Sequence, residues 1–190
     1  MKKIVVTGGP ASGKTTILSI LKEEYGTDIE AAIEAATLVY GGGFPRNDKS
    51  PRHTYHAQRI IYFVTKELEL LAEENNPQAK LIVCDRGSLD GATYWPYGVE
   101  DFLKTMQTTV EDEYKKYYAV IHMSPPKEAK FYQNTAVRTE SLERAMQIDE
   151  DILKLWSGHP RHIVIPESND YVKKALIVRK AVRKIINGEI

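Results

Sequence analysis

A glycine-rich turn close to the start of the chain constrains the fold more than any other feature. Its sequence, GGPASGKT, spans Gly8–Thr15 and matches the pattern G-x-x-x-x-G-K-[ST]. Residues 3–7 before it are mostly apolar and predict a buried strand, and a helical apolar stripe begins at Lys14. Average residue usage produces this pattern by chance in roughly one chain of this length in a hundred. The position between a strand and a helix therefore indicates a genuine phosphate-binding loop.

The residue types of this loop suit the phosphates of a nucleotide. Glycines let successive backbone N–H groups turn inward, and the following helix directs its positive end at the same anion. We expect Lys14 to reach the β- and γ-phosphates and the Thr15 hydroxyl to bind Mg²⁺. The predicted nucleotide-binding residues are Gly8, Gly9, Pro10, Ala11, Ser12, Gly13, Lys14, Thr15 and Thr16.

Strands and helices alternate along the rest of the chain. The predicted strands are residues 3–7, 28–33, 80–85, 117–123 and 161–166. The predicted helices are residues 14–25, 34–40, 53–74, pieces within 88–116, 140–156 and 169–186. This alternation predicts an α/β fold: a three-layer phosphate-loop NTPase with a five-stranded parallel sheet between helices.

The longest predicted helix, 53–74, has apolar residues at helical spacing, which we assign to the core. They are Ala57, Ile60, Ile61, Val64, Leu68 and Leu71.

Composition narrows the remaining possibilities. A chain of 190 residues with 42 % hydrophobic residues fits one domain, residues 1–190. Lys+Arg and Asp+Glu both number 26, and this balance argues against nucleic-acid binding. The single cysteine, Cys84, excludes an intrachain disulfide. No apolar run approaches the ~18 residues of a membrane span, and the first apolar run is too short for a signal peptide. We therefore expect a cytoplasmic protein.

A second segment, LIVCDRGSLDGATYWP at residues 81–96, carries the next candidate site residues. Asp85 ends a predicted strand, where α/β sheets place their ligands. There it can bind Mg²⁺ or accept the proton of an acceptor hydroxyl, and the alternative is a turn or cap residue. Arg86 can contact a substrate or a phosphate. Asp90 and Tyr94 either line an acceptor pocket or are an ordinary first-turn acid and a packed ring.

Several segments together resemble the AAA domains related to NadR, to nicotinamide riboside kinases and to the TRPL translocation defect protein. The matching pieces are VVTGGPASGKTT, IEAAT, GGGFPR, IVCDRGSLDGATYWP and VRTES. The resemblance implies a kinase-like five-stranded sheet with a mobile lid, here residues 124–144. Members of that group often have E-x-x-R in the second piece. This chain has Glu34-Ala35-Ala36-Thr37 instead, so the arginine is missing at that place.

The resemblance also implies lid arginines, for which Arg138 and Arg144 are the candidates. Such arginines close on the transferring phosphate and exclude water. The alternative is pairing with Glu140 or Glu143 at the start of a helix. Glu34 follows a predicted strand and is a candidate for metal or acceptor binding.

Two further segments have open interpretations. Gly41–Gly43 form either a flap, with Arg46 as an anion contact, or a plain connector. In the last helix, Leu176 and Ile185 are expected to face the core. Its basic residues form either a solvated face or, as the resemblance to a trafficking protein allows, a contact with anionic lipid. These residues are Lys173, Lys174, Arg179, Lys180, Arg183 and Lys184.

Three functions remain open. The first is a phosphotransferase that moves the ATP γ-phosphate to a small, nucleoside-like acceptor. The others are a nucleotide-dependent switch and a simple NTP hydrolase. The sequence contains no guanine-reading N-K-x-D segment, which favours ATP with Mg²⁺ over GTP. For the phosphotransferase, the predicted catalytic residues are Lys14, Asp85 and Arg138. The predicted substrate-binding residues are Glu34, Arg86, Asp90 and Arg144, and the predicted metal ligands are Thr15 and Asp85.

Overall fold

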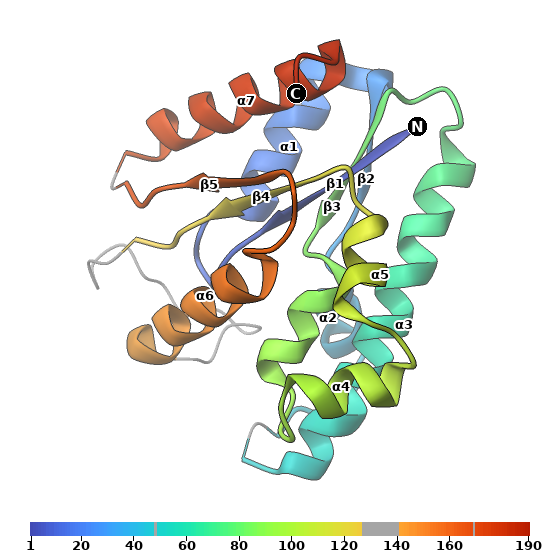
Figure 1. Ribbon diagram of the computed structural model, residues 1–190, viewed down its shortest axis with the longest axis vertical. Coiled ribbons are helices and arrows are strands. Elements are labelled where there is room, and N and C mark those ends of the chain that lie inside the picture. The colour runs from blue at the N-terminus through green and yellow to red at the C-terminus, as the bar shows by residue number, and fades with distance from the viewer. Residues whose placement is uncertain (48, 127–140, 169) are drawn as a thin grey trace.

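The computed structural model describes residues 1–47, 49–126, 141–168 and 170–190, and it contains a five-stranded parallel sheet (Figure 1). The strands are β1 (Lys2–Thr7), β2 (Ile29–Ala32), β3 (Leu81–Asp85), β4 (Ala119–Met123) and β5 (His162–Ile165). Their order in the sheet is β2-β3-β1-β4-β5, and every neighbouring pair is parallel. The predicted α/β fold with five parallel strands is therefore confirmed.

Helices cover both faces of this sheet, as parallel strands require. The α-helices are α1 (Lys14–Tyr25), α2 (Ala35–Gly41), α3 (Pro51–Asn75), α4 (Val99–Met106), α5 (Val110–Lys115), α6 (Leu142–Trp156) and α7 (Tyr171–Asn187). Two short 3₁₀ helices, η1 (Gly26–Asp28) and η2 (Ser88–Tyr94), complete the described elements. The sheet with its two helical layers makes three layers, as predicted.

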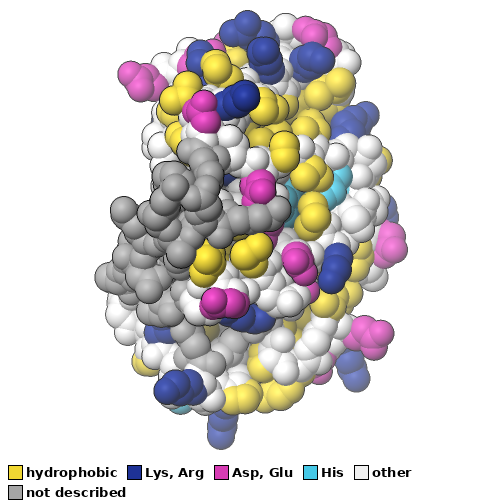
Figure 2. All heavy atoms as spheres, turned by 90° about the vertical axis from the view of Figure 1, so that its left-hand side faces the viewer, with side chains coloured by type: hydrophobic (Ala, Val, Ile, Leu, Met, Phe, Trp, Pro, Cys, Tyr) yellow, Lys and Arg dark blue, Asp and Glu magenta, His cyan; other side chains and the backbone are white. Residues whose placement is uncertain are grey.

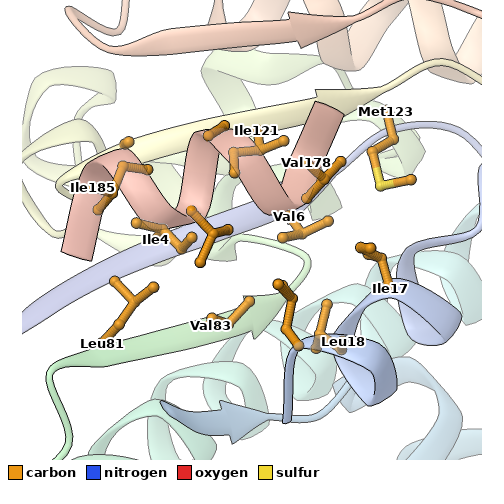
Figure 3. Close-up of a cluster of buried hydrophobic side chains, with 14 of the residues drawn as sticks. Ile4, Val6, Ile17, Leu18, Leu81, Val83, Ile121, Met123, Val178 and Ile185 are labelled. Atoms are coloured by element: carbon orange, nitrogen blue, oxygen red, sulfur yellow. The ribbon is translucent and has the colours of Figure 1, made fainter. Parts of the chain in front are cut away.

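Each face of the sheet has its own core. Alternate side chains of β1 point to opposite faces, so Ile4 and Val6 enter one core and Val5 enters the other. The first core lies under α1 and α7, which cover the same face of the sheet. Figure 3 shows Ile17 and Leu18 of α1 and Val178 of α7 packed around the strand residues of this core. The second core lies under α3, α4, η2 and α6. Because both faces are buried, the central strands are mostly apolar.

The orientation of α3 differs from the prediction. Ala57 is buried as expected, but Ile60 and Leu71 are exposed. The buried face of α3 instead contains Gln58, Tyr62, Glu69 and Ala72. The Glu69 carboxylate accepts a hydrogen bond from Tyr117 and pairs with Lys3 at 3.0 Å. A buried acid is held only where such partners exist, and this rotates the helix away from its simplest apolar face.

The last helix, α7, also differs in part. Ile185 is buried as predicted, whereas Leu176 is exposed and Lys174 is buried. Arg179 and Arg183 both pair with Glu24 of α1. Figure 2 shows the Lys and Arg side chains at the upper end of the molecule, where α7 lies, interleaved with acidic and hydrophobic ones. The basic residues of α7 therefore do not form one continuous free face.

Among the described residues, no helix combines the length and the apolar character that crossing a membrane requires.

The carboxyl ends of three adjacent strands bring the candidate residues to one edge of the sheet. The phosphate loop follows β1, Glu34 follows β2, and Asp85 is the last residue of β3. These strands are neighbours in the order β2-β3-β1, although their sequences are far apart. The fold thus assembles a site at the edge where parallel α/β sheets bind ligands.

Candidate active site

Two glycines shape the phosphate loop. Gly8 has φ +129°, and a β-carbon there would lie 2.1 Å from the carbonyl oxygen of Met123. Gly13 has φ +93° and is the N-cap of α1, where a β-carbon would lie 2.4 Å from the Tyr171 ring. Any other residue at these positions would combine an unfavourable φ with a collision. The loop therefore closes tightly between β1 and α1.

Lys14 folds back across this loop. Its Nζ lies 3.0 Å from the Gly8 carbonyl oxygen, 2.9 Å from that of Gly9 and 3.1 Å from Ser12 Oγ. Burial, with repulsion from Arg86, lowers the pKa of Lys14 to about 8. Negatively charged phosphate oxygens at this position would stabilise its ammonium form.

Asp85 and Thr15, the two predicted metal ligands, lie next to each other. The Thr15 hydroxyl donates to Asp85 Oδ2 at 2.8 Å. Burial raises the pKa of Asp85, with nearby Glu34 raising it further and Lys14 opposing both. The other oxygen, Oδ1, is buried and accepts no hydrogen bond from the described residues. Hard oxygen ligands with one uncompensated carboxylate oxygen fit Mg²⁺, which prefers one or two carboxylates together with substrate phosphates.

Arg86 and Glu34 form an ion pair on the other side of Lys14. Arg86 Nε lies 2.6 Å from Glu34 Oε1, and Arg86 Nη1 lies 3.7 Å from Asp90 Oδ2. Burial would raise the pKa of Glu34, but Arg86, a hydrogen bond from Thr37 and the charge of Lys14 together lower it to about 2. Thr37, which stands where the related domains often have arginine, donates to Glu34 at 2.6 Å. Glu34 is therefore ionised at neutral pH.

Asp90 anchors this pair to the core. Its two carboxylate oxygens accept hydrogen bonds from the Thr7 hydroxyl and, at 2.7 Å, from Trp156 Nε1. The side chain is almost fully buried. Asp90 thus holds β1, α6 and Arg86 together, and it also lines the cleft described next. Tyr94 lines the same cleft, and its ring centroid lies 5.9 Å from Arg86 Cζ.

A cleft of about 520 Å³ extends from the phosphate loop along α2, α3 and η2. Lys14, Thr15 and Thr16 form one end, together with backbone of Pro10, Ala11 and Gly13. Glu34 and Arg86 lie in its wall. Its volume falls within the range of about 300–1,000 Å³ typical of small-molecule sites.

Most of the predicted site residues meet in or beside this cleft. Arg144, in the first turn of α6, and Arg46 both line it. Gly41–Gly43 do not belong to its wall. Arg138 and most of the predicted lid segment, 124–144, lie outside the described residues. The roles proposed for these residues remain predictions.

The sequence analysis missed the residues that α3 contributes to the cleft. Gln58 and Tyr62 are both buried and both line the cleft. The Gln58 side chain fits against Gly91, where a β-carbon would lie 3.1 Å from Gln58 Oε1. A polar amide next to Ala57 at the predicted buried face is the signal that could have identified Gln58.

The sequence analysis also missed a buried polar cluster behind the phosphate loop. Asp149 Oδ1 accepts a hydrogen bond from the Gly9 N–H at 2.6 Å and lies 2.9 Å from His122 Nε2. Lys174 Nζ donates to the carbonyl oxygens of Ser12 at 3.1 Å and Ser124 at 2.6 Å. Burial lowers the pKa of Lys174 to about 8, although Asp149 opposes this.

This cluster connects the loop to α6, β4 and α7. Asp149 interrupts the apolar positions of α6, between Ala145 and Ile152, and an acid at such a position was the available signal. Contacts of this kind fix the loop backbone, so that its N–H groups are already in position when a phosphate binds.

The sequence model of one family, described as an AAA domain, matches residues 3–174, which is most of the chain. Among solved structures, the fold is similar to that of deoxyadenosine kinase from M. mycoides, a structure with bound dATP. The TM-score is 0.63 with 11 % sequence identity, and the alignment covers 96 % of this chain and 100 % of that one. At that identity the similarity shows the fold alone. No curated protein sequence matches the chain significantly.

Proposed function

The chain belongs to the AAA domain family, and on that premise we propose that it transfers the γ-phosphate of ATP to a small, nucleoside-like acceptor. The observation that carries this proposal is the cleft that continues beyond the phosphate loop. Its wall contains Glu34 and Arg86, which lie next to Lys14. A nucleotide switch or an NTP hydrolase does not need a cleft that continues past the phosphate loop to a second set of polar side chains. Similarity in fold to a deoxyadenosine kinase supports the same choice of acceptor class.

In this proposal the loop and its neighbours hold the nucleotide. The loop N–H groups and Lys14 bind the β- and γ-phosphates. Thr15 and Asp85 hold Mg²⁺, which would neutralise charge on the phosphate oxygens. The same residues can hold the phosphates of GTP, so the preference for ATP over GTP remains part of the proposal.

Glu34 is better placed than Asp85 to accept the proton of the acceptor. Both carboxylates already accept hydrogen bonds, but Glu34 is ionised and lies in the cleft wall, whereas Asp85 does not belong to that wall. As the acceptor oxygen bonds to the γ-phosphorus, its proton passes to Glu34, and the bond to the β-phosphate oxygen breaks to release ADP. Arg86 positions the acceptor, and Arg144, with the predicted lid residue Arg138, stabilises charge on the transferred group.

The polar and aromatic groups of α3 suit a nucleoside. The Gln58 amide can both donate and accept hydrogen bonds with a heterocyclic base, and Tyr62 offers an aromatic wall. The riboside substrates of the related kinases belong to the same chemical class, and we include them among the candidates. The free, buried Cys84 supports a reducing, cytoplasmic location.

The test is ADP release with ATP and Mg²⁺ in the presence of nucleosides, other ribosides and nucleoside monophosphates. At least one compound should raise turnover well above the rate with water alone. Glu34→Gln should then lower that turnover by about 10²–10⁴-fold, the usual effect of losing a positioned acid or base. The matched control is Glu30→Gln, because Glu30 lies on β2, the strand that Glu34 follows, but pairs with Lys22 outside the cleft.

Each alternative function has its own outcome in this assay. Turnover that no compound raises would identify a hydrolase, and ATP binding without turnover would identify a switch. Unchanged turnover in Glu34→Gln, with an active acceptor present, would assign the proton to another residue.

A further inference from the structure

A second pocket lies at the edge of the sheet where the strands begin. Its wall comes from the start of β1, the last turn of α3, the segment that joins α5 to β4 and the segment that joins α6 to β5. Because all five strands are parallel, this edge is opposite to the one that holds the phosphate loop, and the N mark in Figure 1 lies at it. The pocket has a volume of about 520 Å³.

Positive side chains dominate the wall of this second pocket. Among the described residues that line it, Glu73 is the only acid, against five cations. The cations are Lys2, Lys3, Lys115, Lys116 and Arg161. Three of the lysines pair with nearby acids, but Lys2 and Arg161 form no ion pair with the residues that the structure describes. A concave wall with uncompensated positive charge attracts anions.

The two cations without an acidic partner lie over the same aromatic ring. Lys2 Nζ is 4.4 Å and Arg161 Cζ is 4.3 Å from the centroid of the Tyr118 ring. Lys2 also donates a hydrogen bond to the carbonyl oxygen of Ile185. Cation–π contacts restrict both side chains without removing their charge. Two positive groups are therefore held close to each other in the pocket wall.

The backbone of the pocket is fixed by His159. The buried ring of His159 accepts a hydrogen bond from the Arg161 N–H at Nδ1, at 3.1 Å. The proton of the neutral ring is therefore on Nε2, which donates to the Tyr117 carbonyl oxygen at 3.0 Å. These two bonds join the backbone of Arg161 to that of Tyr117, so the wall is in place before a ligand binds.

We propose that this pocket is a second anion site, which binds a small phosphate-bearing ligand far from the phosphate loop. The guanidinium of Arg161 can bind two phosphate oxygens at once, and Lys2 adds a single ammonium group. Lys115 pairs with Asp112 at the surface, where its side chain is 75 % exposed. Such a pair is weak in water, so Lys115 can turn to a ligand at little cost. This site does not depend on the reaction assigned to the cleft.

A buried hydrogen-bond network joins the second pocket to the cleft. Lys116, in the wall of the second pocket, donates to the fully buried Glu113 at 2.6 Å. Glu113 also accepts hydrogen bonds from Tyr62, at 2.7 Å, and from Ser88, and both of these residues line the cleft. The Ser88 N–H donates to the hydroxyl of Tyr117, a residue of the second pocket, at 3.0 Å.

This network makes the second pocket an effector site. Burial would raise the pKa of Glu113, but hydrogen bonds from Lys116, Ser88 and other neighbours lower it, so Glu113 is ionised at neutral pH. A phosphate that draws Lys116 toward the second pocket leaves this buried charge with fewer partners. Tyr62 and Ser88 then adjust around it, and the wall of the cleft changes with them.

The experiment is a titration of the isotopically labelled full chain with pyrophosphate, followed by amide chemical shifts. Pyrophosphate can also bind the phosphate loop, so the titration uses the Lys14→Ala protein. The amides of Lys3 and Tyr118 should shift and reach saturation. Adding Arg161→Glu should weaken this binding at least about tenfold, because a charge-assisted hydrogen bond is lost.

The matched control is Lys80→Glu. It makes the same change of charge at the same edge of the sheet, directly before β3, but Lys80 pairs with Asp28 outside the pocket. It should leave the affinity for pyrophosphate nearly unchanged. Circular dichroism checks that each variant remains folded. The absence of a saturable shift at the pocket amides, or equal weakening by both substitutions, would overturn the proposal.

Two further readings of the same titration extend the test. ADP in place of pyrophosphate shows the source of the phosphates, since tighter binding of ADP supports a nucleotide and weaker binding supports a free polyphosphate. The Ser88 amide, which lies outside the pocket, should shift together with the pocket amides. A saturated pocket that leaves Ser88 and Tyr62 unshifted would overturn the effector role.

Discussion

At the scale of single residues, the site works through ionisable groups that shift one another. Lys14, Asp85, Glu34 and Arg86 lie close enough to shift one another's pKa values, so each charge depends on its neighbours. Burial makes the charged form of Lys14 costly, and the paired acids offset part of that cost. A bound triphosphate would change this balance most strongly at Lys14.

Nucleotide binding should therefore be coupled to proton uptake above about pH 8. The pKa of Lys14 is lowered from 10.5 to about 8, so a growing fraction of the free protein has neutral Lys14 as the pH rises through 8. Bound phosphates favour the ammonium form, so binding above that pH must take up a proton and affinity must fall. Calorimetry in buffers of different ionisation enthalpy measures the uptake directly.

Lys14→Arg is the control for this coupling, because arginine stays protonated throughout the range. It should abolish the pH-dependent proton uptake, and Lys14→Ala should abolish most of the binding. Proton uptake that is the same at about pH 6, two units below the pKa of Lys14, as it is above pH 8 would contradict the role given to Lys14.

Asp85 should affect turnover more than nucleotide binding. Asp85→Asn keeps the shape of the side chain but removes the charge that would hold Mg²⁺ beside Thr15. Because Lys14 and the loop amides still bind the phosphates, affinity for ATP should fall modestly. Turnover with an active acceptor should fall by about 10²–10⁴-fold. Single-turnover rates and ATP titrations of both proteins, across a range of Mg²⁺ concentrations, separate the two effects.

At the scale of elements, helices far along the chain hold the phosphate loop in place. Asp149 of α6 accepts the Gly9 N–H, Lys174 of α7 holds the Ser12 carbonyl oxygen, and Tyr171 donates to the Gly13 carbonyl oxygen at 3.0 Å. Each contact joins residues at least 140 positions apart in sequence. The conformation of the loop therefore depends on α6 and α7 as well as on its own glycines.

Asp149→Ala should destabilise the fold and weaken nucleotide binding. It leaves the Gly9 N–H and His122 without their shared partner, and an unsatisfied buried polar group costs about 1–3 kcal/mol. Denaturant unfolding of the two proteins measures the loss. Asp151→Ala, on the exposed side of the same helix, should change stability by less than about 0.5 kcal/mol. Equal effects of the two substitutions would show that Asp149 has no special role.

At the scale of the whole molecule, one sheet separates two cores and presents one edge to ligands. The core under α1 and α7 supports the phosphate loop, and the core under α3, α4 and α6 supports the part of the cleft that α3 and η2 line. α3 belongs both to the second core and to the cleft wall, so it connects the packing of the sheet to the shape of the cleft.

The sequence by itself determined what depends on neighbouring residues. The strand–loop–helix unit, Gly8 and Gly13 at positions with positive φ, and the parallel sheet all follow from local pattern and from the alternation of strands and helices. The position of Asp85 beside Thr15 follows from the same reasoning, because the carboxyl ends of parallel strands share an edge.

Only the tertiary structure decided which face each helix presents and which distant groups meet. Periodicity predicts that α3 has an apolar side, but Glu69 and its partners Lys3 and Tyr117 rotate that helix so that Ile60 and Leu71 face outward. The sequence analysis also did not predict that Asp149 and Lys174 support the loop, although the position of Asp149 among the apolar residues of α6 was a signal. The physical reason is that a buried polar group is stable only beside its partners, and those partners are brought together by packing of segments that lie far apart in the sequence.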